Sequence, residues 1–382
     1  MDLRALKLRM LKRMYFAPEV CCGPELSERL RYFEPGARIL VLITDSAGRT
    51  GLLDQVAARL SDASAYELIQ WTWGEPAASS VAGLRQRVQE FKPDWIVGIG
   101  GGTVLDAAKF VSAEYENPAL HWSEQTQAVP GPRTRARLAL VPTTSGSGSE
   151  ASQAAILTGS DGKKLACVSP YWLPDLVILD PVLTTTLPAA ETASTGFDAL
   201  AHAVESTASN LAHDLLRELC ATAIRAILRH LARAVDNPRE MEARAGLQNA
   251  AFLAGSCQSG TSTGAAHALA HATSQHYHTP HARAVSAYLL PTMRWNLAKN
   301  PRVYDAMAAA CGMSDGMALI GAIEELARAV GSPLRLADLL SRELTASERR
   351  DLAGAALKDG CLRTNACRMR QDDLEAVLCG ME

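Results

Sequence analysis

The sequence predicts an α/β domain followed by an all-helical domain, and three observations lead to this fold class. Short apolar runs alternate with helical patterns through the first half of the 382 residues, the arrangement that builds a parallel sheet covered on both faces. After about residue 187 the strand patterns stop, and alanine- and leucine-rich segments take over. Prolines punctuate the join, LPDLVILDPVLTTTLP at 173–188. We therefore expect domains at 1–187 and 188–382, with a ligand pocket in the cleft between them.

Four apolar runs in the first half are strand candidates because they are rich in β-branched and large apolar residues and are bounded by turn residues. They are ARILVLIT at 37–44, YELIQWTW at 66–73, DWIVGIG at 94–100 and RLALVP at 137–142. In the second half, apolar residues recur at the three- and four-residue spacing of helices. The segments are 190–209, 211–234, 240–256, 264–276, 284–298, 301–311, 316–330 and 346–359.

Composition argues for a cytoplasmic protein without a nucleic-acid or membrane partner. A net charge of −3 leaves no basic field that would attract nucleic acid. Nine scattered cysteines without a C-x-x-C pair indicate reduced thiols. No run of 18 apolar residues is present. The segment MDLRALKLRMLKRMYF lacks a secretory apolar core, so we read it as a surface amphipathic segment, with a transit peptide as the alternative.

A glycine-rich turn between a strand and a helix, in GIGGGTVLDAAK at 98–109, is the candidate phosphate site. Glycines here let backbone N–H groups approach an anion, and the following helix adds the positive end of its dipole. A plain tight turn is the alternative. Thr103 and Leu105 stand where the last glycine of G-x-G-x-x-G would fall, so any dinucleotide site is of another type.

Two other loops belong to the same hypothesis. Asp45 follows the first predicted strand, where a carboxylate accepts hydrogen bonds from ribose hydroxyls and repels a 2′-phosphate, favouring NAD over NADP. An ordinary turn aspartate is the alternative. The loop VPTTSGSGSEAS at 141–152 supplies hydroxyls and glycine flexibility directly after a buried strand, where a linker seldom lies.

The helical half carries a candidate metal site. Asp198 and His202 are four residues apart and therefore share one helix face. His267 and His271 repeat the spacing on a second helix, and His281 follows after a loop. One carboxylate and three imidazoles can surround a divalent first-row metal and leave room for a substrate oxygen. Any one helical histidine is usually structural, so the set carries the prediction.

Taken together, five ordered motifs resemble the iron-containing, group III alcohol dehydrogenases. They are GGGTVLDAAK, VPTTSGSGSE, LVILDPVLTTTLP, TGFDALAHAVE and HALAHATSQHYHTPH. The resemblance covers most of the chain, from the strand before Asp45 to GCLRTNACRMRQDDLEAVL at 360–378. It implies the dehydroquinate synthase-like fold of that family, with a Rossmann-like nucleotide-binding domain and an all-α metal-binding domain.

The resemblance also implies residue roles. The family's ligands for Fe²⁺, or for Zn²⁺ in some members, correspond to Asp198, His202, His267 and His281. The histidine beside nicotinamide and substrate corresponds to His271. The positions near NAD correspond to Asp45, Gly101, Gly102, Thr103, Asp106, Thr143, Thr144, Lys164 and Leu183.

Some positions depart from the family pattern. Glu75 replaces a frequent Asn, and TNA at 364–366 replaces TNP. Ala282 and Ser286 replace the usual Gly and Asn. The segment GSCQSGTSTG at 255–264 is more polar than in members that handle short apolar alcohols. With Arg283 close by, it favours a polar or anionic aldehyde, such as a semialdehyde or phosphonoacetaldehyde; the alternative is that Arg283 points to solvent.

The leading hypothesis is an NAD(H)- and divalent-metal-dependent alcohol dehydrogenase or aldehyde reductase. The metal polarises the substrate oxygen, hydride passes between the substrate and nicotinamide, and His271 relays the proton. One alternative is a dehydroquinate synthase-like lyase, whose ligand set lacks the Asp198–His202 pair. The other is a non-catalytic metal or nucleotide sensor, against which the four filled ligand positions argue. The expected partners are a small alcohol or aldehyde and, from the family, further copies of the chain in a homodimer or larger homo-oligomer. His276 and His278 are expected to be solvated.

Overall fold

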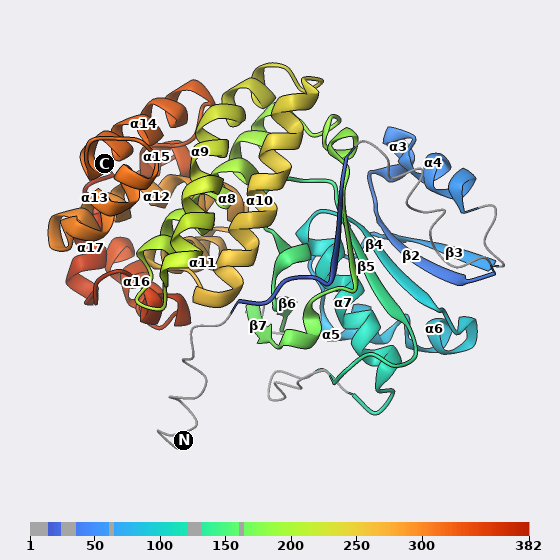
Figure 1. Ribbon diagram of the computed structural model, residues 1–382. Helices are drawn as coiled ribbons and strands as arrows, with labels where there is room; N and C mark the ends of the chain where they lie inside the picture. Colours follow the sequence, from blue (N-terminus) through green and yellow to red (C-terminus); the bar gives the residue numbers. More distant parts are fainter. Residues whose placement is uncertain are drawn as a thin grey trace. The chain divides into compact units, whose positions relative to one another are not determined.

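The computed structural model describes residues 14–23, 36–60, 65–120, 122, 131–159 and 164–381 (Figure 1). The chain forms two compact units, Tyr15–Leu187 and Pro188–Glu382, and Met14 is grouped with the second. Met14 packs against the core of the helical unit. The expected domain bounds, 1–187 and 188–382, stay a prediction, and Met14 is partly buried where it packs against the helical unit. The segment at 1–13 lies outside the described residues.

A six-stranded parallel sheet forms the centre of the first unit, in the order β1-β8-β5-β4-β2-β3. The strands are β1 (Glu19–Cys22), β2 (Arg38–Thr44), β3 (Ala65–Trp71), β4 (Trp95–Gly100), β5 (Arg137–Pro142) and β8 (Leu176–Leu179). The four expected strands are confirmed. Sequence reasoning missed β1 and β8, because each has only four residues and shows no usable periodicity.

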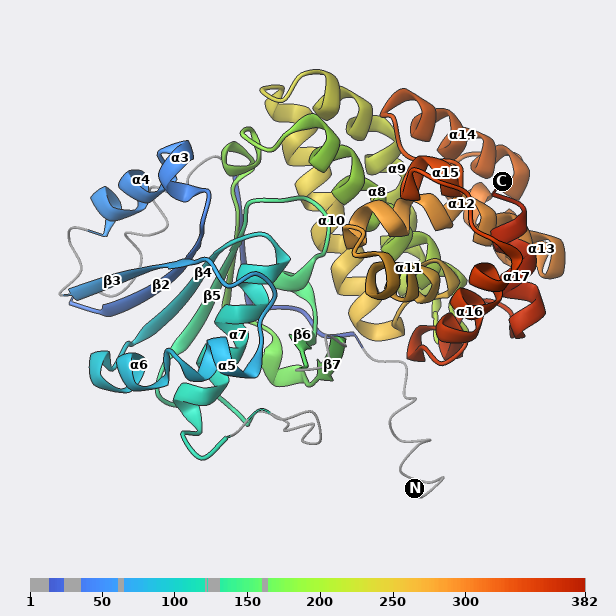
Figure 2. The same cartoon turned by 180° about the vertical axis from the view of Figure 1, so that it is seen from behind.

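Both faces of this sheet are buried, as a parallel sheet requires. Along β2, Leu40 and Leu42 belong to one apolar cluster, while Ile39, Val41 and Ile43 belong to another. The helices of this unit are α3 (Ala47–Thr50), α4 (Leu52–Arg59), α5 (Ala78–Ala82), α6 (Arg85–Phe91) and α7 (Gly102–Glu116), seen from both sides in Figures 1 and 2. A separate antiparallel hairpin joins β6 (Ala154–Thr158) to β7 (Lys164–Val168).

Two glycines in β4 let α7 lie close against the sheet. A Cβ added at Gly98 would lie 2.8 Å from the Cβ of Ala108, and one added at Gly100 would lie 2.7 Å from the Cβ of Val104. Neighbouring atoms in a packed interior do not yield easily to such an insertion. The close approach fixes the beginning of α7 directly after the end of β4.

All the regular secondary structure among the described residues of the second unit is helical. Its helices are α8 (Ala189–Ala208), α9 (Asp214–Asp236), α10 (Met241–Thr261), α11 (Ala265–Tyr277), α12 (His281–Lys299), α13 (Pro301–Ala310), α14 (Gly316–Ala329), α15 (Leu336–Leu340), α16 (Ala346–Ala356) and α17 (Gln371–Cys379). The eight expected helical segments are present, and only the short α15 and α17 were not singled out. Helix α8 packs against α9, α10 and α12 and so lies inside the bundle.

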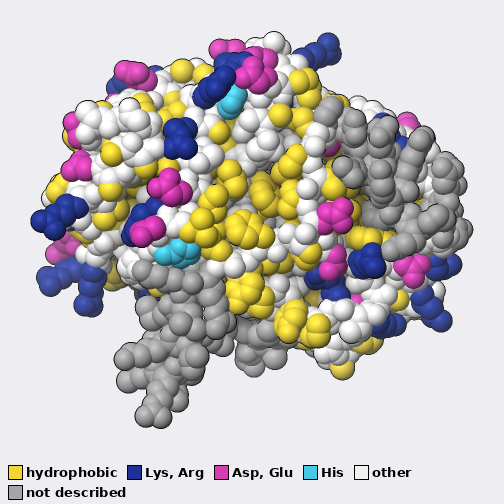
Figure 3. Space-filling model, in the orientation of Figure 1, with side chains coloured by type: hydrophobic (Ala, Val, Ile, Leu, Met, Phe, Trp, Pro, Cys, Tyr) yellow, Lys and Arg dark blue, Asp and Glu magenta, His cyan; other side chains and the backbone are white. Residues whose placement is uncertain are grey.

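The distribution of surface charge does not mark a binding site on the face drawn in Figure 3. Acidic and basic side chains of the described residues are interspersed on the face drawn in Figure 3. None of the described helices combines the length and the apolar character that crossing a bilayer requires.

We expect Gly98→Ala to destabilise the first unit by about 1–3 kcal/mol, the usual cost of overpacking a buried contact. Urea unfolding followed by circular dichroism measures the change. Gly131→Ala is the matched control, because a Cβ there meets no atom within 4 Å. Equal midpoints for the two variants would show that α7 is not held close by this glycine.

Candidate functional site

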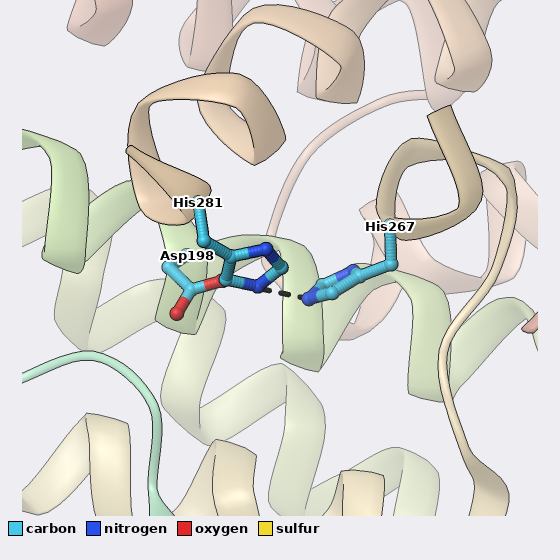
Figure 4. A group of neighbouring side chains, drawn as sticks. All are labelled: Asp198, His267 and His281. Carbon is cyan, nitrogen blue, oxygen red and sulfur yellow. Dashed lines mark ion pairs between the residues drawn. The ribbon is translucent and has the colours of Figure 1, made fainter. Parts of the chain in front are cut away.

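Three helices of the second unit bring the expected ligands together. Asp198 lies in the middle of α8, with His202 one turn later. His267 is the third residue of α11, and His281 is the first residue of α12. Figure 4 shows the side chains of Asp198, His267 and His281 pointing towards one another.

The carboxylate of Asp198 is the point on which the imidazoles converge. Its Oδ1 atom lies 3.4 Å from Nε2 of His267, 3.8 Å from Nε2 of His202 and 3.9 Å from Nε2 of His281. One ligand atom each from Asp198, His267 and His281 falls within 4.8 Å of the others. The rings of His202 and His267 stack with centroids 4.7 Å apart, so His202 lies against the same cluster.

The sequence of α8 explains how the helices approach so closely. Ala199, Ala201 and Ala203 are neighbours of Asp198 and His202 in the helix and are fully buried. Alanine has no side chain beyond Cβ, so neighbouring helices can pack close to the α8 backbone. The carboxylate at 198 and the imidazole at 202 then project from one face of a helix that is buried on nearly all sides.

Electrostatics make this cluster a site for positive charge. Burial by itself would raise the pKa of Asp198, but the nearby positive charges of His202, His281 and His267 lower it below its ordinary value. Burial by itself would lower the pKa of His267, but Glu205 and Asp198 raise it to about 10. The buried carboxylates of Asp198 and Glu205 therefore favour positive charge in this cluster, either a proton on His267 or a metal ion.

The residues fit a divalent metal by a second observation. Oδ1 of Asp198 and Nε2 of His267 are buried and make no hydrogen bond among the described residues. Buried polar atoms of this kind normally have a partner, and a metal ion takes oxygen and imidazole nitrogen ligands at about 2.0–2.2 Å. A mixed set of one oxygen and three nitrogens suits first-row divalent ions such as iron and zinc.

His271 stands at the edge of the cluster and is paired with a residue that sequence reasoning missed. Its ring stacks on His281 with centroids 5.1 Å apart, and its side chain is 35% exposed. Nδ1 lies 2.8 Å from Oδ2 of Asp359. Burial would raise the pKa of Asp359, but the hydrogen bond and charge of His271 lower it to about 2. Asp359 is therefore an anion that orients this imidazole.

The histidine-rich segment also contains residues outside the cluster. His276 and His278 are exposed; His276 contacts the carbonyl of Ala272 through Nδ1, at 2.8 Å. His278 ends α11 in the left-handed region, with φ 54°. The expectation that both are solvated holds.

Polar residues expected to contact a substrate have other partners here. Arg283 is exposed, and it donates to the carbonyl of Asp338 at 3.0 Å. Ser256 and Thr261 donate to carbonyls one turn earlier in their own helix. Cys257 is fully buried and its thiol contacts the carbonyl of Leu216, on α9. These contacts give no support to an anion pocket at Arg283, whereas Oε1 of Gln258, in the same helix as Cys257, is buried and makes no hydrogen bond among the described residues.

The nucleotide-binding candidates of the first unit gather at the carboxyl ends of its central strands. Neighbouring strands β2 and β4 are parallel, so Asp45 and Gly101 follow them at the same sheet edge. Strand β2 lies between β3 and β4 in the sheet, so the two strands that follow it in the sequence pair with its opposite edges. Open α/β sheets bind ligands at such a topological switch point. Asp45 is exposed there.

The two small-residue loops of this edge touch each other. A Cβ added at Gly102 would lie 2.7 Å from Oγ of Ser147, and one at Gly101 would lie 3.4 Å from Thr144. Gly101 precedes the first turn of α7, to which Gly102 and Thr103 belong. Thr143 and Thr144 are half-buried. Helix starts leave backbone N–H groups unbonded and attract anions, so this junction suits a pyrophosphate.

A buried lysine and aspartate fasten the second loop to α7. Lys109 is 1% exposed and donates to the carbonyls of Ser149 at 2.7 Å, Ser152 at 3.1 Å and Ala154 at 2.7 Å. Burial lowers its pKa to about 8, so it remains a cation at neutral pH.

Asp106 accepts hydrogen bonds from Oγ of Ser149 at 2.5 Å and from the amide of Ile156 at 3.0 Å. Both carboxylate oxygens therefore hold the loop, and the predicted role of Asp106 at the cofactor site would be indirect.

Two predicted cofactor residues lie elsewhere in the first unit. Lys164 begins β7, and its side chain lies outside the described part of the chain. Leu183 lies in a short 3-10 helix, Pro181–Thr184, and packs against the apolar cluster on one face of the sheet. Their contacts with a nucleotide stay predictions.

Comparison with known proteins gives similarity along nearly the whole chain. Residues 17–181 match the family model "Iron-containing alcohol dehydrogenase", and residues 192–380 match "Fe-containing alcohol dehydrogenase family, C-terminal". The probable alcohol dehydrogenase EutG of Escherichia coli is 31% identical over 369 residues, covering 94% of this chain and 92% of its own.

An NADPH-dependent butanol dehydrogenase of Clostridium saccharobutylicum is 27% identical over 378 residues, with 96% of this chain and 97% of its own covered. Among solved structures, an iron-containing alcohol dehydrogenase from Thermococcus thioreducens superposes with a TM-score of 0.88 at 28% identity. That alignment covers 97% of this chain and 99% of the other.

We expect Lys109→Met to weaken NADH binding roughly tenfold, the equivalent of about 1.4 kcal/mol, because the loop at 143–154 loses the cation that fastens it. Fluorescence titration of the metal-free protein with NADH measures the affinity, and a thermal melt reports folding. Lys92→Met in the same unit is the control, since Lys92 is exposed. Unchanged NADH affinity in a folded variant would separate this loop from the nucleotide site.

Proposed function

Because this chain belongs to the iron-containing alcohol dehydrogenase family, we propose that it interconverts a small alcohol and its aldehyde with NAD(H) and a divalent metal. The convergence of three imidazole Nε2 atoms on one carboxylate oxygen carries this function. Such a ligand set in a helical unit, in one chain with an α/β unit that carries a candidate phosphate-binding turn, serves hydride transfer better than lyase chemistry or sensing.

Four side chains would hold the metal: Asp198, His202, His267 and His281. Fe²⁺ is the family's metal, and Zn²⁺ is the alternative that the same donors accept. When bound, a divalent cation supplies Lewis-acid polarisation of the substrate oxygen. The chain's contribution is to keep the donors buried and close together before any ion arrives, so little reorganisation is needed.

His271 is the residue we assign to proton transfer. The Asp359 carboxylate accepts only, so it favours the tautomer in which Nδ1 of His271 carries the proton and Nε2 can take another. Its partial exposure leaves a route by which that proton reaches solvent. His271 lies next to His281 and His267, within reach of a substrate oxygen at the cluster.

The nucleotide site would be the carboxyl edge of the sheet in the first unit. Backbone N–H groups of Gly102 and Thr103 would face the pyrophosphate, with Gly101 allowing close approach. The hydroxyls of Thr143 and Thr144 lie at the same junction. The cofactor supplies hydride chemistry at its nicotinamide, while the chain positions it.

Substrate selectivity stays at the level of a small alcohol or aldehyde. Ser256 and Thr261 have partners inside the bundle, and Arg283 donates to the carbonyl of Asp338. Oε1 of Gln258 is a buried acceptor without a hydrogen bond among the described residues. A substrate panel should therefore include propanal and butanal beside an anionic semialdehyde.

We expect His267→Ala to remove the bound metal and to lower the rate of aldehyde-dependent NADH oxidation by at least about 100-fold. Polarisation of the substrate by a metal lowers the activation free energy by several kcal/mol, and about 1.4 kcal/mol corresponds to a tenfold change in rate. Elemental analysis of the purified protein gives metal content, and the loss of NADH absorbance gives turnover. His276→Ala, on the exposed end of the same helix, is the control. Full turnover by wild-type protein in chelated, metal-free buffer would overturn the proposed function.

We expect Asp45→Ala to improve the ratio of kcat/KM for NADPH over NADH about fivefold, because a like-charge contact at an exposed position is worth about 1 kcal/mol. Steady-state kinetics with both cofactors measures the ratio. Asp54→Ala removes an exposed carboxylate from α4 of the same unit and serves as control. A wild-type ratio in the Asp45 variant would contradict the assignment of Asp45 to the adenosine ribose.

A further inference from the structure

We propose that Glu205 is a positioning residue that fixes the ring of His267 in its ligand tautomer, while Asn365 anchors the start of the same helix. This inference rests on the metal site proposed above. Neither side chain belongs to the set of four metal donors. Both act on α11 from distant parts of the sequence.

Glu205 holds His267 through one oxygen and the helix backbone through the other. It lies on α8, one turn after His202, and is 8% exposed. Its Oε2 atom lies 2.5 Å from Nδ1 of His267. Its Oε1 atom accepts from the amide of Ala266 at 2.8 Å. The side chain and the backbone of α11 are therefore tied to α8 by one carboxylate.

Asn365 completes the anchorage from the other direction. Its Oδ1 accepts from the amide of Ala265, the first residue of α11, at 3.2 Å. Its Nδ2 donates to the carbonyl of Cys367 at 2.8 Å. It also forms a reciprocal amide pair with Asn296, with distances of 2.9 and 3.2 Å. Asn365 is 7% exposed, so these bonds form away from water.

The beginning of α11 has no local substitute for these contacts. The residue before the helix is Gly264, which has no side chain to cap the first amides. A Cβ at this position would lie 2.8 Å from both Oδ1 of Asn365 and Oε1 of Glu205. A usual capping residue, Ser, Thr, Asp or Asn, would therefore displace the two side-chain oxygens that bond the first amides. The amides left unbonded by helix geometry are satisfied from α8 and from the segment after α16.

The carboxylate also decides which nitrogen of His267 can bind a cation. A carboxylate only accepts, so it favours a proton on Nδ1 of His267. The other nitrogen, Nε2, lies 3.4 Å from Oδ1 of Asp198 and is then the nitrogen that a cation would bind. Histidines that bind metals commonly have their second nitrogen held in this manner, and losing the holder costs about 10–100-fold in metal affinity.

The Glu205→Gln variant distinguishes a role in orienting the His267 ring from a role in holding α11 in place. A glutamine has nearly the same shape, but its amide nitrogen donates. If its oxygen keeps the bond to Ala266, its nitrogen faces Nδ1 of His267 and favours the tautomer whose Nε2 carries the proton. That tautomer cannot bind a metal through Nε2, the nitrogen that faces Asp198. Asn365→Ala, in contrast, removes the anchor of Ala265 and leaves the Glu205–His267 contact in place.

We would titrate the full-length, metal-stripped variants with Zn²⁺ by calorimetry. The expected result for Glu205→Gln is a 10–100-fold weaker affinity. For Asn365→Ala, the expected result is a lower thermal midpoint of the metal-free protein with a smaller change in affinity. Glu191→Gln is the matched control, because it makes the same chemical change at an exposed position of α8. Nitrogen-15 spectra of labelled histidine report the His267 tautomer directly.

Wild-type Zn²⁺ affinity in Glu205→Gln would overturn the inference, as would equal losses in Glu205→Gln and Asn365→Ala. If Glu205→Gln does not fold, Glu205→Asp keeps an acceptor that is one methylene shorter. An unchanged His267 tautomer together with wild-type Zn²⁺ affinity in that variant would support the inference, and a Nε2-protonated ring would contradict it. Retention of Zn²⁺ by His267→Ala is a different result, since it would refute the proposed metal site itself.

Discussion

The helical unit is organised around one buried charge, the carboxylate of Asp198. At 3% exposure it has almost no water to stabilise it, and a buried anion is tolerated only with compensating positive charge and hydrogen bonds. Imidazoles from three helices lie within 4 Å of this carboxylate and can share a cation with it. The alanines beside it and the central place of α8 follow from the same need, because the donors must approach within a few ångströms of one oxygen.

Satisfied polar groups around this charge make the arrangement rigid. Glu205 and Asn365 bond the first amides of α11, and Asp359 bonds the ring of His271. Each of these three residues lies far from its partner in sequence, and the bonds of Glu205 and Asn365 to the α11 amides are buried. In the TNA segment, Ala366 stands where the family has proline. This change leaves the hydrogen bonds of Asn365 in place, because its side-chain amide makes them.

In the first unit, the geometry of the parallel sheet positions the residues of the candidate nucleotide site. Parallel strands end at one edge, so the residues that follow β2, β4 and β5 gather there without direct contact between their strand sequences. Glycines in β4 bring α7 close, and the buried cation of Lys109 fastens the second loop. Small side chains and backbone amides dominate this edge, as the close approach of a pyrophosphate requires.

Sequence alone determined the two kinds of unit, the four long strands and the main helices, because each leaves a periodic apolar pattern within a few residues. It also indicated the metal donors, since Asp198 and His202, and likewise His267 and His271, mark helix faces by their spacing. Glu205 lies on that same face, three residues after His202, and this spacing was the available signal. Only the tertiary structure decided the partners of Glu205, Asp359 and Asn365. Their contacts span 61 to 100 residues, and no local pattern records which distant side chain a buried polar atom will meet.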